Sequence, residues 1–283
     1  FYELKGYIPN NINIHTWFSF LIQHGVKPYQ SVIYDGNVMG LLLVNQKSGL
    51  RGYNRYKQPV YFGESDPSKY YFSQSHLIYS DKLAKFVVRA NELTNGLVIK
   101  RIGKIYSHIF IDEVQDMAGY DLEIIKLLFG LETNILLVGD PRQVTYHTHD
   151  EAKYSQYADG NIEGFIEKEC AGYLVEIDDT TLNKTYRNNK DICCFANSIY
   201  PNFKPCEYEG QELTNHDGVF FVSSADVDGY LEKYNPVQLR DSRKKVVNQN
   251  YPVMTFGESK GLTFDRVLIY QTTPMVQWIF DRR

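Results

Sequence analysis

The sequence predicts an α/β protein made of two parallel-sheet domains, and three observations support this fold class. The chain has 283 residues, which is enough for two compact domains. With 43% hydrophobic and 23% charged residues, its composition is that of a soluble globular protein and excludes a disordered tail, a fibrous repeat and a disulfide-bonded peptide. From about Lys104 onward, short apolar runs alternate with segments of helical periodicity, which is typical of parallel strands joined by helices.

The expected elements fall into two domains, 1–178 and 179–283, separated by a break at Asp178 to Thr181. In the first domain, apolar periodicity fades where Tyr, Gly, Ser and Lys collect, so we expect an irregular insertion over about 28–100. Apolar runs predict strands and amphipathic periodicity predicts helices. The expected strands are 105–111, 135–138, 173–177, 219–222, 252–256 and 267–270, and the expected helices are 121–129, 190–200 and 227–234.

Charge, cysteine content and hydropathy limit the partners and the location. The formal net charge is -4, so any polyanion must be held in a local groove and not by bulk charge. The four cysteines show no metal-type or disulfide-framework spacing, so a reducing cytoplasm is the expected location. No stretch approaches the ~18 to 20 consecutive apolar residues of a spanning helix, and we expect no membrane partner.

One apolar strand, Ile109 to Ile111, ends in the adjacent carboxylates Asp112 and Glu113. In an open α/β sheet, the carboxyl end of a strand borders the ligand crevice. There Asp112 can hold Mg²⁺ through water, and Glu113 can orient or deprotonate an attacking water. The alternative for an isolated Asp-Glu pair is a solvated turn in which Asp caps a helix.

A second apolar strand ends in the run from Gly139 to Gln143, Gly-Asp-Pro-Arg-Gln. If the two strands are neighbours in a parallel sheet, Asp140 and Gln143 lie beside the same crevice, where an amide can contact a terminal phosphate. The alternative is a Pro-containing turn with incidental polarity. Two polar strand ends at this spacing favour a nucleotide site.

These residues resemble the motifs of superfamily 1 helicases of the UvrD/Rep/PcrA type. Residues 112–116, Asp-Glu-Val-Gln-Asp, are similar to Walker B (motif II), and 139–143 to motif III. Residues 182–197 are similar to motif IV, and Thr255 with 259–265 to motif V. The segment His15-Thr16-Trp17 resembles the one that touches DNA in the first domain. The resemblance extends from about residue 12 to residue 270 and implies two RecA-like domains, of the 1A and 2A types.

The resemblance implies ATP and Mg²⁺ as cofactors and single-stranded or partly duplex DNA as the partner. It gives Asp112 as the Mg²⁺ ligand, Glu113 as the catalytic base and Gln143 as the phosphate sensor. Without the other motifs, Tyr186 and Arg187 would be interpreted as a helix start with an exposed cation. For Trp17, stacking on a DNA base and filling the core are equally good interpretations. The other implied residues are Arg187 as the cross-domain arginine finger, Tyr186, Asp140, Lys260 and Gly261 as nucleotide contacts, and His15, Thr16, Trp17 and Tyr146 as DNA contacts.

The chain also departs from the helicase pattern. It contains no P-loop, G-x-x-x-x-G-K-[ST], and no motif VI arginine segment after Tyr270, so we expect it to be incomplete at both ends. Thr148 stands where motif III has an aromatic that stacks on bases, an interaction worth ~1 to 3 kcal/mol per base. In motif V, Thr263 replaces a Glu and Gly257 replaces a His.

Two functions follow from this pattern. The first is an ATP-dependent DNA helicase that moves 3′ to 5′ on single-stranded DNA, favoured by a complete set of metal ligand, base, sensor and arginine finger. The alternative is a helicase-like subunit that senses DNA or nucleotide and regulates a partner nuclease without productive unwinding. Thr148 and the compact second half favour this alternative. Short UvrD-like proteins of this kind resemble helicase subunits of anti-phage systems such as Gabija.

Overall fold

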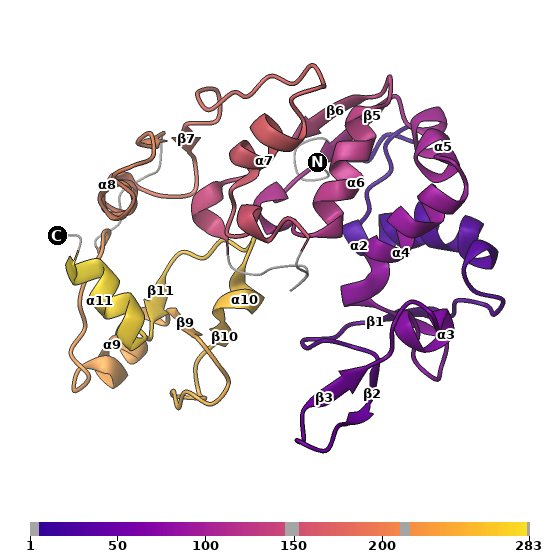
Figure 1. Cartoon of the computed structure of the whole chain (residues 1–283). Coiled ribbons are helices and arrows are strands. Elements are labelled where there is room, and N and C mark those ends of the chain that lie inside the picture. The colour runs from indigo at the N-terminus through magenta and orange to yellow at the C-terminus, as the bar shows by residue number, and fades with distance from the viewer. Residues whose placement is uncertain (1–5, 145–152, 210–215, 282–283) are drawn as a thin grey trace. The chain divides into compact units, whose positions relative to one another are not determined.

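The computed structural model describes residues 6–144, 153–209 and 216–281 (Figure 1). The chain divides into two compact units, Phe1–Val175 and Glu176–Arg283. Within the described ranges, no helix has both the length and the apolar character that crossing a bilayer requires.

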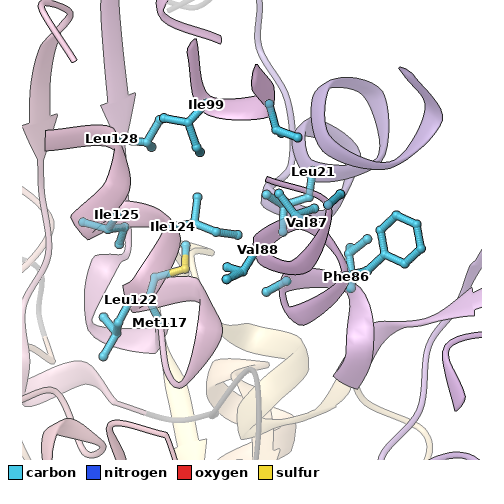
Figure 2. Close-up of a cluster of buried hydrophobic side chains, with 14 of the residues drawn as sticks. Leu21, Phe86, Val87, Val88, Ile99, Met117, Leu122, Ile124, Ile125 and Leu128 are labelled. Atoms are coloured by element: carbon cyan, nitrogen blue, oxygen red, sulfur yellow. The ribbon is translucent and has the colours of Figure 1, made fainter. Parts of the chain in front are cut away.

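The core of the first unit lies between the helices α4 (Ser80–Leu93) and α6 (Tyr120–Phe129), whose apolar faces meet (Figure 2). In α4 the buried side chains recur at helical spacing, and α6 contributes a second fully buried row. Burying each such side chain stabilises the fold by ~1.5 to 3 kcal/mol. The other α-helices in the described part of this unit are α2 (Trp17–Leu21), α3 (Pro67–Tyr70), α5 (Leu97–Ile105) and α7 (Ile162–Glu169).

The described residues of the first unit also form three strand pairs. The pair that concerns the site is β5 (His108–Ile111) with β6 (Asn134–Leu137), which run parallel and are joined by α6. This βαβ unit confirms the sequence-based expectation, although β5 begins later than predicted because α5 continues to Ile105. The other pairs are β1 (Gly40–Leu42) with β4 (Leu77–Tyr79), which are parallel, and β2 (Leu50–Tyr53) with β3 (Pro59–Tyr61), which are antiparallel.

The second unit contains a three-stranded parallel sheet in the order β10-β9-β11. Small parallel sheets accompanied by helices occur in both units, so the predicted mixed α/β class is confirmed at that level. The strands are β9 (Val237–Arg240), β10 (Val253–Thr255) and β11 (Val267–Ile269), with a further parallel pair β7 (Lys184–Thr185) and β8 (Glu207–Tyr208); the helices are α8 (Lys190–Ile199), α9 (Val227–Tyr234), α10 (Phe256–Ser259) and α11 (Thr273–Asp281).

Several elements differ from the sequence-based expectation. Residues 173–177 and 219–222 form no strand, because an apolar run becomes a strand only where a neighbour pairs with its backbone. The central strand β9 was not predicted, because the polar Gln238 interrupts its apolar pattern. Gln238 is nevertheless fully buried: its amide donates to the Asn248 carbonyl at 2.8 Å and accepts from the Tyr270 hydroxyl at 2.7 Å. The segment 28–100, expected to be irregular, contains the core helix α4.

Candidate functional site

Strands β5 and β6 lie side by side and bring the two polar strand ends together, as predicted. The ladder pairs His108 with Asn134 and Ile111 with Leu137. It continues past both strands, since the Val138 N–H donates to the Ile111 carbonyl at 2.8 Å and the Val114 N–H donates to the Val138 carbonyl at 3.0 Å. The residues that follow β5 and β6 are therefore held at one edge of the sheet.

The chain turns sharply at Glu113, directly after β5. Glu113 has φ 55° and ψ 37°, in the left-handed region, and a 3₁₀ turn over Val114–Asp116 follows it. Asp112 supports this turn, because its Oδ1 accepts a hydrogen bond from the Glu113 N–H at 2.9 Å. A residue with a side chain in this region costs of order 1 to 3 kcal/mol, so the surrounding structure must impose the conformation. Such strain is concentrated at functional sites.

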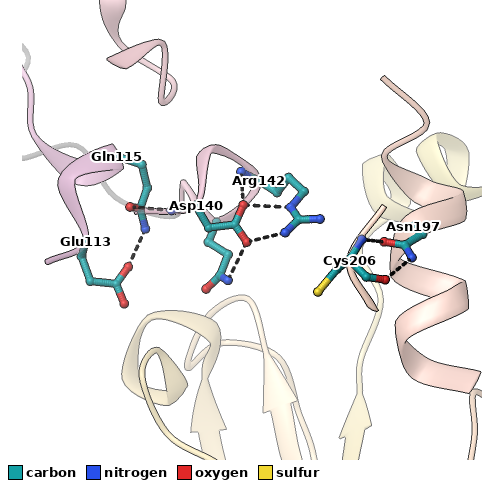
Figure 3. A network of polar contacts seen from close by, with 7 residues as sticks. Glu113, Gln115, Asp140, Arg142, Asn197 and Cys206 are labelled. Atoms are coloured by element: carbon teal, nitrogen blue, oxygen red, sulfur yellow. Dashed lines mark hydrogen bonds and ion pairs between the residues drawn. The ribbon is translucent and has the colours of Figure 1, made fainter. Parts of the chain in front are cut away.

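The side chain of Gln115 connects the two strand ends (Figure 3). It is only 3% exposed, and its amide nitrogen donates to Oε2 of Glu113. Its amide oxygen accepts a hydrogen bond from the backbone N–H of Asp140 at 3.2 Å. Gly139 allows this approach, since a Cβ at that position would lie 2.5 Å from Gln115 Oε1.

Asp140 is the centre of the polar contacts after β6. Its carboxylate accepts from the Arg142 guanidinium at 2.8 Å (Nε to Oδ1) and 3.0 Å (Nη2 to Oδ2), and Gln143 Nε2 donates to Oδ2 at 2.9 Å. Partial burial disfavours the charged carboxylate, but the hydrogen bonds from Arg142 and Gln143 outweigh burial and hold the pKa of Asp140 below its usual value. The Gln143 amide is thereby oriented by a charged neighbour at the sheet edge.

The donor chemistry at this edge suits Mg²⁺ bound together with a phosphate. Asp112 is an exposed carboxylate at the carboxyl end of β5. Mg²⁺ in phosphoryl-transfer sites is bound by one or two carboxylates, with water and phosphate oxygens as the remaining ligands. In the described part of the chain, no three His, Cys, Asp or Glu side chains gather into a metal-binding cluster. A single carboxylate such as Asp112 therefore fits this mode of binding and not an all-protein cage.

The residues near the N-terminus that were predicted as DNA contacts lie at the start of α2 or just before it, and all three contact other residues of the first unit. Thr16 is the N-cap of α2, and its Oγ1 accepts from the Ser19 N–H at 3.2 Å. Trp17 is partly buried, and its indole N–H donates to Oδ1 of the buried Asp121 at 2.7 Å. His15 is half-buried, with its ring packed edge-on against His24. Tyr146 lies outside the described residues.

The predicted residues of motifs IV and V lie in the second unit. Tyr186 and Arg187 directly follow β7; both are exposed, Tyr186 to 67%. Lys260 and Gly261 follow α10, and Gly261 has φ +77° with open space around the position of a Cβ.

A capping box between Thr255 and Glu258 starts α10 and so positions the residues after it. The carboxylate of Glu258 accepts hydrogen bonds from the Thr255 backbone N–H, from Arg243 and from the Thr255 hydroxyl. These hydrogen bonds lower the pKa of Glu258 to about 2. This carboxylate is therefore ionised when it caps the helix at neutral pH.

The structure thus brings together Asp112, Glu113, Asp140 and Gln143 at one sheet edge, and it adds two residues to which the sequence analysis gave no role. These are Gln115, which joins the strand ends, and Arg142, which forms an ion pair with Asp140. A hydrogen-bonding role of Gln115 could have been predicted, because a glutamine beside buried apolar residues must find hydrogen-bond partners. Its partner on the next strand could not be deduced from spacing.

Comparisons with known proteins agree with this arrangement. Residues 68–157 match the model of the UvrD/REP helicase N-terminal domain, and this range contains both strand ends. The chain is also 29% identical over 122 residues to the probable DNA helicase II homolog of Mycoplasma genitalium. That match covers 43% of this chain and 16% of the relative, so the chain spans only a small part of the relative's length. Both comparisons support the UvrD-like helicase family.

Proposed function

We propose that the chain forms part of an ATP-dependent DNA helicase or translocase that moves 3′ to 5′ along single-stranded DNA. The observation that carries this proposal is the contact chain from Glu113 through Gln115 to Asp140, which unites the ends of β5 and β6. The match of residues 68–157 to the UvrD/REP helicase N-terminal domain supports the same activity.

In this proposal, Asp112 and Glu113 have different roles at the end of β5. Asp112 is a ligand of Mg²⁺, which when bound with ATP neutralises charge on the phosphates. Glu113 accepts a proton from the attacking water, and Gln115 keeps the carboxylate pointed toward the sheet edge. Gln143 contacts the terminal phosphate as a sensor, held by Asp140.

The second unit carries further residues that we propose as nucleotide contacts. Tyr186 offers an exposed ring on which adenine can stack, and Arg187 supplies a cation for charge on the transferring phosphoryl group. Lys260 and the Gly261 backbone N–H supply an ammonium and a donor for phosphate oxygens. The proposed DNA contacts are Thr16, which is exposed, together with His15, Trp17 and Tyr146.

The substitution Glu113→Gln in the complete gene product tests the proposal. The amide keeps the shape of the side chain but cannot accept a proton, so ATP turnover stimulated by single-stranded DNA is expected to fall at least ~100-fold. Binding of a fluorescent ATP analogue is expected to persist. Glu167→Gln, at an exposed position on α7, is the matched control and is expected to be active. Near-normal turnover by Glu113→Gln would refute the role of Glu113 as the base.

The alternative is a subunit that regulates a partner nuclease in phage defence without productive unwinding. Its main support is Thr148 in place of a base-stacking aromatic, and Thr148 lies outside the described residues. The same assay separates the two proposals when strand separation is measured beside ATP turnover. Turnover with unwinding supports the helicase, and turnover without unwinding supports the regulatory subunit.

A further inference from the structure

The antiparallel hairpin formed by β2 and β3 carries a concentration of positive charge. Residues 47–61, here called the basic hairpin, contain Lys47, Arg51, Arg55 and Lys57. No Asp or Glu occurs between Gly36 and Gly63, in a chain whose formal net charge is -4. The basic hairpin is therefore a local positive patch on a protein that is acidic as a whole.

The charges of the basic hairpin are available to a partner. Every residue from 53 to 60 is exposed, and so are Lys47 and Arg51. Within the described ranges, none of the four cations forms an ion pair with a carboxylate. Figure 1 shows the hairpin extending from the end of the first unit that holds β1 and α3. These side chains thus make no ion pair with the described fold, and their charge suits an external anion.

Exposed aromatic rings alternate with these cations. Tyr53 is 69% exposed and Tyr56 is 66% exposed, although rings of this size are usually buried in part. The Arg55 guanidinium lies 4.7 Å from the centre of the Tyr56 ring, and Lys47 Nζ lies 4.7 Å from the centre of the Tyr61 ring. Cations next to open aromatic faces are the combination that binds phosphates and unstacked bases together.

The loop that presents these groups is held in one conformation by Asn54. Oδ1 of Asn54 accepts from the N–H groups of Tyr56 at 2.9 Å and Gln58 at 3.0 Å, and Nδ2 donates to the Gln58 side chain at 3.0 Å. Lys57 has φ 60°, and its N–H donates to the Asn54 carbonyl at 2.9 Å. A loop that is already ordered loses less conformational entropy on binding, which favours affinity.

We propose that the basic hairpin is a second DNA-contact surface, which binds single-stranded DNA through phosphate contacts from Arg55 and Lys57 and base stacking on Tyr56. A single strand fits better than a duplex, because only unpaired bases expose faces to a ring such as Tyr56. The choice of DNA as the ligand rests on the proposed function. The basic hairpin shares no residue with the ends of β5 and β6.

Fluorescence anisotropy with a labelled oligothymidylate of about 20 nucleotides tests the inference on the complete gene product, at two salt concentrations. The double variant Arg55→Gln/Lys57→Gln is expected to bind about tenfold more weakly at low salt, and its salt slope to fall by about 1.4, or 0.7 per lost phosphate contact. Tyr56→Ala is expected to weaken binding at least about fivefold, whereas Tyr56→Phe keeps the ring and binds normally.

The matched control is Lys104→Gln/Lys168→Gln, which removes two exposed cations of the same unit outside the hairpin. If the hairpin variant loses no more DNA affinity than this control, the inference is overturned. It is also overturned if the hairpin substitutions reduce binding to phosphatidylserine vesicles but leave DNA affinity intact, because the ligand is then an anionic membrane. Loss of DNA affinity in the hairpin variants together with full ATP turnover by Glu113→Gln would retain the hairpin surface and reject the proposed base.

Discussion

Gln115 and Asp140 lie on different strand ends, and the Gln115 amide oxygen accepts a hydrogen bond from the Asp140 backbone N–H at 3.2 Å. This bond joins the segment after β5 to the segment after β6 where the candidate site lies. Because Gln115 is buried, a substitution there leaves the Asp140 N–H without its partner. The bond is therefore a structural element of the candidate site.

Gln115→Leu is expected to lower stability and activity together. The unsatisfied Asp140 N–H costs ~1 to 3 kcal/mol of unfolding free energy. Without the amide donor, Glu113 also loses its orientation, and we expect kcat for ATP turnover to fall about tenfold or more with KM little changed. Thermal unfolding and steady-state kinetics measure the two effects. Gln156→Leu, at an exposed position, serves as the control. An unchanged kcat in Gln115→Leu would mean that the hydrogen bonds of Gln115 to Glu113 and Asp140 have no part in ATP turnover.

Gly139→Ala is expected to destabilise the first unit. The added Cβ would lie 2.5 Å from Gln115 Oε1 and 2.9 Å from Val114 Cγ1, so the strand ends must separate. Overpacking of this kind costs ~1 to 3 kcal/mol. Gly229→Ala is a control of opposite sign, because Gly229 lies within α9 with open space around it, and alanine there is expected to stabilise by ~0.5 to 1 kcal/mol. Circular dichroism melts compare the two. Equal melting temperatures for both variants would contradict the close approach at Gly139.

The free energy of unfolding is expected to depend on pH because the carboxyl group of Asp140 ionises. Its pKa is lowered in the folded chain, so the ionised carboxylate stabilises the fold above its unfolded pKa, and this stabilisation is lost as the pH falls through the folded pKa. Asp140→Asn is therefore expected to be less stable than wild type near neutral pH, and the difference is expected to vanish as the pH falls through the lowered folded pKa of Asp140. Urea unfolding at several pH values gives the comparison. A difference that stays constant across this range would show that the charge on Asp140 is irrelevant to stability.

Trp17→Phe tests the hydrogen bond from the Trp17 indole to Asp121, which the proposed DNA contact of the Trp17 ring does not require. Phenylalanine keeps an aromatic ring beside Phe20 but removes the indole donor to Asp121, so we expect a loss of ~1 to 3 kcal/mol in stability and little change in DNA affinity. A double-mutant cycle with Asp121→Asn isolates the energy of this contact. If the substitution weakens DNA binding without affecting stability, Trp17 contacts DNA and its bond to Asp121 contributes little.

Elements with a strong local pattern could be predicted from the sequence, and those that depend on distant partners could not. Helix α9 has the predicted bounds, and the βαβ unit around α6 follows from apolar runs and helical periodicity alone. Strand β9 was missed because the burial of Gln238 depends on hydrogen bonds to Asn248 and Tyr270, which lie 10 and 32 residues further along the chain. At the site, spacing correctly predicted that the residues after β5 and β6 meet, whereas the bridge through Gln115 depends on tertiary contact.

The three hydrogen bonds between the end of β6 and Glu113 all run in the same direction. Gln143 donates to the Asp140 carboxylate, the Asp140 backbone donates to Gln115, and Gln115 donates to Glu113. The middle donor is a peptide N–H, which cannot reverse its role, so the amide of Gln115 cannot flip without placing two donors face to face. Aligned hydrogen bonds polarise one another. Under the proposed role of Gln143, a phosphate that draws its amide away from Asp140 would change the electric field at Glu113, on the neighbouring strand end.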